Sequence, residues 1–563
     1  MKHNILLAYL LFQSLFTSAQ LVTPDIEWIN GITSTAPVSP DELDLAITDI
    51  AVSPGGQVYI AGSCFAPCTF APGVVISPNA QTTTIFLAKY QSNGQLDWIK
   101  TLENDISATV YLTAPEEDGV YLTTAFSANE LQLGNGISVS GSCNGIACTN
   151  VLLAKFDNTG QPKWARAFYG GDFGFLDVTG ISAAPNNRVV VSMGYNSDQV
   201  DLGPNFQYNN LPSLGMVLAY ANADNGATTD AIFPIVSNKP VYAKAFAMNE
   251  SGQSVITGTF NNQIVFSGGI VLGTAQPEGA YFVAGLDADG TTKWAKKISS
   301  VGPATNVVAV DIDMFGNAYT ALWAQDDIRV DNNTILDFKP NIAGVVLKIN
   351  EESTSAPVFI INNTDYNVID DVKVDDFGHI YTAGTTSTTI EFGSESIGSD
   401  GCFDALVTIS TTEGNPLGIR TIGENGCEWI SNAGYGSCIE LDNQGNVYGY
   451  GIYIYGFEEE GYSFNARGGF LTEMRSGITD SEEPATTQLD VFPNPNTGAF
   501  TLKLPESPSA DAFISIRNLQ GQELFRQTAH QQEINLETTL SPGLYLISVN
   551  DGKKIFSGKI ERM

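Results

Sequence analysis

The feature that most constrains the fold of this chain is a short strand pattern that recurs at nearly constant spacing. The pattern reads GQVYIAGS, DGVYLTTA, NRVVVSMG, GQSVITGT, GNAYTALW, GHIYTAGT and GNVYGYGI. Its central positions, called the strand anchors below, are Tyr59, Tyr121, Val190, Val255, Tyr319, Tyr381 and Tyr448, separated by 62, 69, 65, 64, 62 and 67 residues. Self-similarity at a fixed period is typical of repeat architectures, in which each unit packs on its neighbours.

Two further patterns keep the same period. Apolar residues recur at Phe70, Leu133, Leu202, Phe266, Val330 and Phe392, and flanking glycines predict a hairpin inserted in each repeat. The segment IFLAKYQSNGQLDWIKTL is echoed twice, and its tryptophans Trp98, Trp164 and Trp294 are 66 and 130 residues apart, one and two periods. Three unrelated patterns with one period indicate a true structural repeat.

Each repeat predicts four antiparallel strands. In the first repeat they lie near residues 49–53, 58–64, 85–90 and 97–102. Turns such as Ser-Asn-Gly between the last two strands favour a hairpin, because Gly and Asn accept a positive φ. Four strands repeated seven times predict an all-β fold, a seven-bladed β-propeller.

The two ends of the repeat region predict how this ring closes. The seventh unit runs to Ile478 without a tryptophan strand, whereas DIEWINGI, with Trp28, precedes the first unit and matches QLDWIKTL. We therefore expect Ile26–Ile32 to complete the seventh blade. Pairing of the two ends would remove the open sheet edge of an unclosed array.

The repeats resemble the bacterial β-propeller repeats called SBBP repeats. Residues 85–98, 151–164 and 281–294 match that pattern, whereas the repeats at 216–233, 344–361 and 404–422 lack its tryptophan. The resemblance implies a secreted bacterial β-propeller.

The N-terminus predicts a secretory signal peptide over residues 1–19. Lys2 and His3 form a polar start, an apolar run follows from Ile5 to Phe16, and Thr17-Ser18-Ala19 provides small residues for cleavage. Cleavage is expected between Ala19 and Gln20, which assigns residues 20–478 to the propeller.

A polar linker over residues 479–487 precedes a second β pattern over 488–563. Strands around Gln-Gly and Asn550-Asp551-Gly552 turns predict a small Ig-like β-sandwich. LDVFPNPNTGAFTLKL, IRNLQGQEL, LSPGLYLISV and KKIFSGKIERM resemble the type A C-terminal sorting domain of the type IX secretion system. The motif residues are Phe492, Pro493, Asn494, Pro495, Gly498, Gly543 and Tyr545.

This resemblance implies that residues 488–563 interact with the type IX secretion machinery. It implies a secreted, extracellular protein that is attached to the outer cell surface or released. The alternative is an ordinary Ig-like accessory domain.

Seven cysteines are then expected in an oxidising compartment. The near neighbours Cys64/Cys68 and Cys143/Cys148 predict disulfides within loops. Only one pair can form among Cys402, Cys427 and Cys438, and Cys427–Cys438 is favoured. The spacings are not C-x-x-C and no histidine stands nearby, which argues against a metal or redox site.

Charge and histidine content exclude several functions. With 26 basic and 61 acidic residues the net charge is −35, which argues against nucleic-acid binding, and no membrane insertion is expected. The mature chain keeps His379, in a turn, and His530, so neither a Ser-His-Asp triad in the propeller nor a zinc site built from histidines is expected. We predict no catalytic residue, cofactor or metal.

The leading hypothesis is therefore a non-enzymatic binding or adhesion module, which takes a glycan or protein through the blade loops around the central channel. The alternative is an extracellular carbohydrate-active hydrolase or lyase. Its candidate carboxylates are the pairs Asp311/Asp313, Asp370/Asp371 and Asp375/Asp376. A surface protein without a specific ligand is a third hypothesis.

Overall fold

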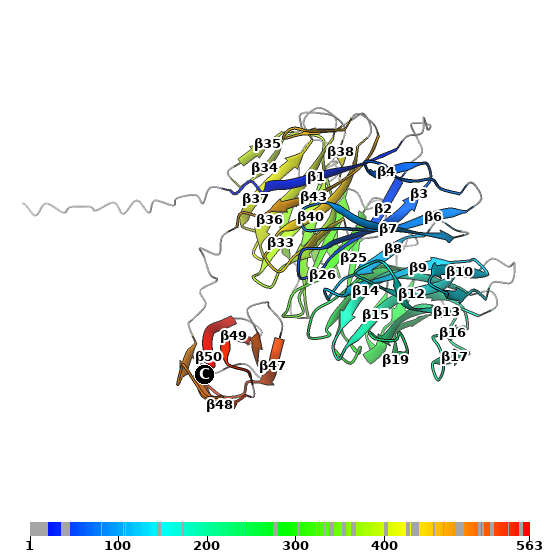
Figure 1. Cartoon of the computed structure of the whole chain (residues 1–563). Helices are drawn as coiled ribbons and strands as arrows, with labels where there is room; N and C mark the ends of the chain where they lie inside the picture. Colours follow the sequence, from blue (N-terminus) through cyan, green and yellow to red (C-terminus); the bar gives the residue numbers. More distant parts are fainter. Residues whose placement is uncertain are drawn as a thin grey trace, which may run out of the picture.

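The structure, a computed structural model, is all-β over the residues that it describes, with strands β1 to β50 and one 3-10 turn at Ser267–Gly269 (Figure 1). It describes residues 21–562 apart from 35–44, 80–81, 105, 107, 143–147, 172–173, 238, 274–279, 301–304, 326, 332, 337–342, 352–355, 362–366, 394, 399–402, 424–427, 430–437, 454–456, 465–466, 479–488, 505–507, 509–511, 518–522, 539 and 551–554.

Seven antiparallel sheets account for most of the described residues before 479, and each repeats the predicted four-strand order. Sheets 1 to 3 contain β2 (Leu45–Val52), β3 (Val58–Cys64), β6 (Thr83–Tyr90) and β7 (Leu96–Asn104); β8 (Val110–Thr113), β9 (Gly119–Phe126), β12 (Asn150–Asp157) and β13 (Pro162–Phe168); and β14 (Phe175–Ala184), β15 (Arg188–Asn196), β18 (Leu214–Asn222) and β19 (Thr228–Ser237). The strands predicted in the first repeat are thus present.

Sheets 4 to 6 have the same order. They contain β20 (Val241–Met248), β21 (Ser254–Phe260), β24 (Ala280–Leu286) and β25 (Thr292–Ser300); β26 (Thr305–Ile312), β27 (Ala318–Ala324), β30 (Ala343–Ile349) and β31 (Ala356–Ile361); and β32 (Asn367–Val374), β33 (His379–Thr386), β36 (Asp404–Thr411) and β37 (Pro416–Ile422).

Sheet 7 combines strands from both ends of the repeat region. It contains β38 (Glu428–Trp429), β39 (Ile439–Leu441), β40 (Val447–Tyr453), β43 (Gly468–Arg475) and β1 (Asp25–Ser34). β1 runs antiparallel to β43, with Asp25 opposite Arg475 and Thr33 opposite Gly468. The pairing expected for residues 26–32 is therefore present.

Short hairpins are inserted between the second and third strands of each sheet, and the first six lie at or directly beside the predicted apolar positions. In chain order they are β4 (Cys68–Ala71) with β5 (Val74–Ile76), β10 (Glu130–Gly134) with β11 (Ile137–Ser140), β16 (Gln199–Asp201) with β17 (Gln207–Asn209), β22 (Gln263–Val265) with β23 (Val271–Gly273), β28 (Ile328–Val330) with β29 (Asn333–Leu336), β34 (Ile390–Phe392) with β35 (Glu395–Ile397), and β41 (Phe457–Glu459) with β42 (Tyr462–Phe464). Two of them extend a neighbouring sheet, because β28 pairs with β25 and β4 pairs with β1.

The first strands of the sheets contact one another in series. β2 contacts β8, and the contacts continue through β14, β20, β26, β32 and β39, which in turn contacts β2. Apolar clusters fill the space between neighbouring sheets, and one of them places Phe86 of sheet 1 with Phe470 of sheet 7. Burial of this apolar surface is the main stabilising contribution of the fold.

Tryptophans of the outer strands pack on turn glycines of the next sheet. Trp28 covers Gly94, and Trp98 covers Gly160, so a Cβ added at these glycines would lie 2.6 Å and 2.8 Å from the indole Cδ2 atom. The indole Nε1 of Trp98 donates a hydrogen bond to the Asn158 carbonyl at 2.9 Å. The recurring tryptophan is therefore a contact between neighbouring sheets.

The C-terminal segment forms two further sheets around a core of its own. One contains β44 (Asp490–Phe492), β45 (Ala499–Lys503) and β48 (Glu533–Glu537), and the other contains β46 (Phe513–Arg517), β47 (Glu523–Thr528), β49 (Gly543–Asn550) and β50 (Ile555–Arg562). Phe500 and Leu536 of the first sheet pack with Ile514, Ile547 and Ile560 of the second.

Candidate functional site

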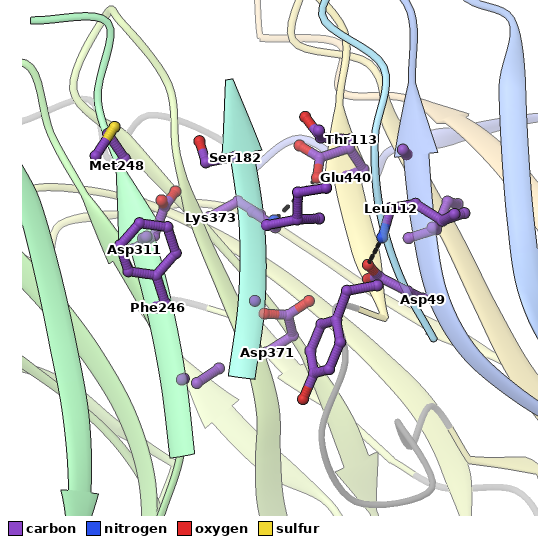
Figure 2. A pocket seen from close by; sticks show the side chains of 18 of the residues that line it. Asp49, Leu112, Thr113, Ser182, Phe246, Met248, Asp311, Asp371, Lys373 and Glu440 are labelled. Carbon is purple, nitrogen blue, oxygen red and sulfur yellow. Dashed lines mark hydrogen bonds and ion pairs between the residues drawn. The ribbon is translucent and has the colours of Figure 1, made fainter. Parts of the chain in front are cut away.

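The first strands of the sheets line a cavity of about 290 Å³, called the inner cavity below (Figure 2). Seven of its lining residues, one from each sheet, form the inner ring: Ala51, Thr113, Ser182, Ala247, Asp311, Lys373 and Glu440. Each stands directly opposite the strand anchor of its own sheet. The repeat therefore places equivalent residues around one cavity.

Charge is confined to one arc of the inner ring. Asp311, Lys373 and Glu440 occupy three consecutive sheets, whereas the other four ring positions carry small uncharged side chains. Lys373 Nζ donates to Glu440 Oε2 at 2.9 Å, with 17% and 29% of the two side chains exposed. Asp371, two residues before Lys373 in β32, also lines the cavity (Figure 2).

Carboxylates near the ring also hold neighbouring sheets together. Asp49 accepts a hydrogen bond from the Leu112 backbone N–H at 2.7 Å, and Asp311 accepts one from Val374 N–H at 2.8 Å. Asp371 accepts from the backbone N–H groups of Cys438, at 2.7 Å, and Ile439. These bonds satisfy backbone groups that would otherwise be buried without a partner.

Burial changes the protonation of these groups. Burial raises the pKa of Asp311 to about 7, although Lys373 and the Val374 N–H act in the opposite direction. Burial and the neighbouring Asp371 raise the pKa of Asp370 to about 7. For Lys373, burial lowers the pKa, but Glu440, Asp371 and Asp311 outweigh it and hold the ammonium charged.

The predicted carboxylate pairs separate into two environments. Asp311 and Asp371 line the inner cavity and Asp370 lies beside Asp371 in β32, whereas Asp313 and Asp375 organise turns. Asp375 accepts backbone hydrogen bonds from Phe377 and His379, and its Oδ2 lies 2.9 Å from His379 Nδ1 and accepts the Tyr381 hydroxyl at 3.1 Å.

Asp313 has the equivalent contacts with Phe315, Asn317 and Tyr319. Asp313 and Asp375 are therefore structural turn residues, with local hydrogen bonds as in an Asx turn. His379 also belongs to this turn, and only 16% of its side chain is exposed.

The sequence motifs did not predict the inner ring as a site. A detectable sequence pattern existed, because every ring residue lies eight positions before its strand anchor. Comparing the repeats at that offset would have shown three charges in succession after four small residues.

The structure describes only some of the cysteines that were predicted to form disulfides. Cys64 and Cys68 are buried and are thiols rather than a disulfide in this structure. Cys148 and Cys438 are also buried, but Cys143, Cys402 and Cys427 lie outside the described residues. The cleavage site at Ala19 and Gln20 is likewise outside them.

The Phe492–Gly498 motif contacts the last strand, β50. Asn494 Oδ1 accepts a hydrogen bond from Glu561 N–H at 2.8 Å, and Asn494 Nδ2 donates to the Lys559 carbonyl. Asn496 donates its backbone N–H to the Glu561 carbonyl at 2.8 Å and accepts from Gly498 N–H. Tyr545, in β49, donates its hydroxyl to the Ser541 carbonyl at 2.7 Å.

Phe492, Pro493, Pro495 and Gly543 lie in or beside the strands that these contacts join. The motif thus joins the first and last strands of the C-terminal domain.

Within the described residues, no group of three or more His, Cys, Asp or Glu side chains is arranged to hold a metal ion. In the same part of the chain, no helix has the length and apolar character needed to cross a bilayer.

Residues 490–561 match a protein family described as the secretion system C-terminal sorting domain. A domain of this family marks secreted proteins, which are often attached to the outer cell surface, so this protein is secreted. It also implies an interaction with the type IX secretion machinery. No curated protein matches the chain significantly.

Solved structures match at low similarity. An ulvan lyase of the polysaccharide lyase family PL25, bound to -[GlcA(1-4)Rha3S]-, has a TM-score of 0.40 and 10% identity, over 81% of this chain and 96% of that chain. Quinohemoprotein alcohol dehydrogenase from Comamonas testosteroni has a TM-score of 0.33 and 11% identity, over 79% and 78%. PorZ, a surface component of the type IX secretion system of Porphyromonas gingivalis, has a TM-score of 0.22 and 10% identity, over 92% and 81%. Similarity at these scores carries no functional argument.

Proposed function

We propose that this protein is a cargo of the type IX secretion system whose seven sheets are the blades of a closed, SBBP-like β-propeller. In this proposal residues 1–19 are a signal peptide, 20–478 the propeller, 479–487 a linker and 488–563 the sorting domain. The contact of β39 with β2 and the pairing of β1 with β43 support closure of the ring.

Truncation tests closure. Removing residues 20–32 deletes most of β1 and exposes the edge of β43, so the melting temperature of the chain should fall sharply compared with a chain that begins at residue 20. An unchanged melting temperature would contradict closure by strand pairing.

We further propose that the propeller binds a glycan or protein segment at the inner cavity and performs no chemistry on it. The observation that supports this role is the charged arc Asp311–Lys373–Glu440, which faces four small ring residues across the cavity. Ligand sites are concave and combine open space with a few fixed polar groups. Carboxylates and an ammonium held in one layer could accept and donate hydrogen bonds to sugar hydroxyls or peptide groups.

The experiment tests retention and turnover together. The chain without its signal peptide is immobilised and exposed to an array of polysaccharides and surface proteins, and both retained ligand and released product are measured. The ring variant Lys373→Met/Glu440→Gln removes the ion pair without changing the net charge. The control Lys293→Met/Glu351→Gln removes an exposed pair whose side chains are 44% and 55% exposed.

Retention that the ring variant loses and the control keeps would support binding at the inner cavity. Retention that both variants keep would place the ligand elsewhere. Released product would favour the second candidate, a polysaccharide-cleaving enzyme.

One observation favours that second candidate. The pKa of both Asp311 and Asp370 is raised to about 7, so each carboxyl could hold a proton near neutral pH, as a general acid requires. Any product formation should then be lost in Asp311→Asn or Asp370→Asn.

A further inference from the structure

Two cysteines meet at the point where the first repeat joins the N-terminal strand. Cys64 ends β3 and Cys68 begins β4, with only Phe65, Ala66 and Pro67 between them. Both cysteines are buried, with 1% and 0% of their surfaces exposed. The hairpin thus turns both side chains into the apolar cluster that joins sheets 7 and 1.

Both thiols belong to this cluster. A hydrogen bond to Cys68, together with burial, raises the pKa of the Cys64 thiol. Cys68 Sγ lies 3.2 Å from the Ala66 carbonyl oxygen, to which it donates. The short β3–β4 connection and the shared apolar cluster therefore keep the two thiols close together.

The position of Cys68 links this pair to closure of the ring. Cys68 stands opposite Ser34, and Thr69 stands opposite Thr33, so β4 is paired with the end of β1. The same end of β1 pairs with β43, where Thr33 is opposite Gly468. Only two register pairs join β4 to β1, which makes this junction short compared with the pairing of β1 with β43.

We propose that the secreted protein joins Cys64 and Cys68 in a disulfide that fixes β4 against the N-terminal strand β1. A secreted protein folds in an oxidising compartment, where disulfides form and persist. The two thiols lose two protons and two electrons as the S–S bond forms. A thiol–disulfide oxidant, either a protein or glutathione disulfide, takes up the electrons and is reduced to two thiols.

Burial determines when the bond can form. The thiolate is the attacking species in thiol–disulfide exchange, and the folded protein disfavours the thiolate of Cys64. Oxidation should therefore be fast in the unfolded chain and slow once β3 and β4 are in place. The disulfide is set during folding and is not a reversible switch of the folded protein.

The first experiment maps the bond. The chain without its signal peptide is refolded from the reduced, denatured state in glutathione redox buffer, then denatured, alkylated without reductant and digested. We expect a peptide that contains Cys64 and Cys68 without alkyl groups, which gains two after reduction. The folded, reduced protein in the same buffer should form this bond at least tenfold more slowly. Alkylation of both cysteines in the refolded, non-reduced protein would overturn the proposal.

The second experiment tests the effect on β1. Hydrogen exchange is compared between oxidised wild type and the double variants Cys64→Ser/Cys68→Ser and Cys64→Ala/Cys68→Ala, with the amides of β13 as an internal reference. The second variant keeps an apolar side chain in the cluster, in case serine prevents folding. Amides at Thr33, Ser34 and Thr69 should exchange faster by on the order of tenfold in the variants, because the loop constraint is lost. Equal exchange with an intact disulfide in the wild type would overturn the role at β1.

Discussion

Arg420 joins three segments that are far apart in the sequence. Its guanidinium donates to Glu459 Oε1 at 2.5 Å, to Glu460 Oε1 at 2.7 Å and to the Pro24 carbonyl at 2.8 Å. Arg420 and Glu459 are both 8% exposed at the side chain, and Glu459 also accepts the Gly423 N–H at 2.9 Å. One side chain in β37 thus holds the hairpin of sheet 7 and the N-terminal segment.

Replacing Arg420 by methionine should therefore destabilise the protein strongly. The change leaves Glu459 buried without its counter-charge, a situation that costs about 3–5 kcal/mol in the free energy of unfolding. The matched control is Arg475→Met, because Arg475 pairs with Glu27 at the surface, with 64% and 34% exposure. Its loss should change stability by less than about 1 kcal/mol. Equal effects of the two variants in urea unfolding would contradict this account.

The contribution of Asp311 to stability should depend on pH in the direction opposite to that of an ordinary ion-paired carboxylate. Burial raises its pKa from the ordinary 3.8 to about 7 in the folded protein, so the folded state binds the proton more tightly. Stability from this group is complete below pH 4 and is lost as the pH rises from about 4 to about 7. Its charged neighbours are Lys373 and Glu440.

The stability of the Asp311→Asn variant, relative to that of wild type, should accordingly increase as the pH rises through this window. The gain should be at least about 1 kcal/mol, the equivalent of one pKa unit. Urea unfolding at a series of pH values measures it. A stability difference that stays constant between pH 4 and pH 8 would show that Asp311 ionises normally.

At the same scale, sequence reasoning located the carboxylates but not their roles. Asp311 and Asp313 are separated by one residue, yet one faces the inner cavity and the other accepts hydrogen bonds in a turn. Their side chains fall in different environments because Asp311 lies within β26, which ends at Ile312, and Asp313 begins the turn that follows. The charge of the inner ring depends on three sheets, so no local motif contains it.

At the scale of the elements, Trp98 of the outer strand β7 requires a glycine in the turn of the next sheet that it contacts. Gly160 has φ of +76° and lies under Trp98, whose Cδ2 would be 2.8 Å from an added Cβ. A left-handed conformation favours glycine, and the indole leaves no room for a side chain. The tryptophan and the turn glycine are therefore two parts of one contact between sheets.

Gly160→Ala should be considerably more destabilising than Gly73→Ala. Gly73 has a similar φ of +80° in the β4–β5 turn, but nothing lies within 4 Å of an added Cβ. Both variants incur the conformational cost of about 1 kcal/mol, and only Gly160→Ala adds the clash with Trp98, roughly 1–3 kcal/mol more. The two variants are compared by thermal or urea unfolding, and equal losses of stability would mean that Trp98 yields without cost.

The elements themselves were largely predictable from the repeat. The strand anchors, the inserted hairpins and the pairing of residues 26–32 follow from periodicity, because each repeat has to bury the same faces. The attachment of Val22 to β37 could not be foreseen. It is made by backbone hydrogen bonds, with Val22 N–H donating to the Leu417 carbonyl at 2.8 Å, and these leave no side-chain pattern.

Across the whole molecule, the described apolar clusters divide into two sets that share no residue. The C-terminal cluster draws only on residues between Leu489 and Ile560, and the other clusters draw only on residues between Leu21 and Ile478. Units with separate hydrophobic cores can fold independently. The division also separates the two functions, export through the sorting domain and the proposed binding at the inner cavity.

Separate cores predict that the two parts unfold separately and can be cut apart. A fragment of residues 20–478 should keep the melting temperature of the main calorimetric transition of the chain within about 2 °C, because no core residue is lost.

The Asn496→Ala variant removes side-chain hydrogen bonds to Gly498 N–H and the Glu561 carbonyl, so it should lower only the melting temperature of the C-terminal domain. It should reduce export, whereas ligand retention by the purified protein stays unchanged. A single transition that shifts as a whole in this variant would mean that the two cores are coupled, and that export and binding cannot be separated by mutation.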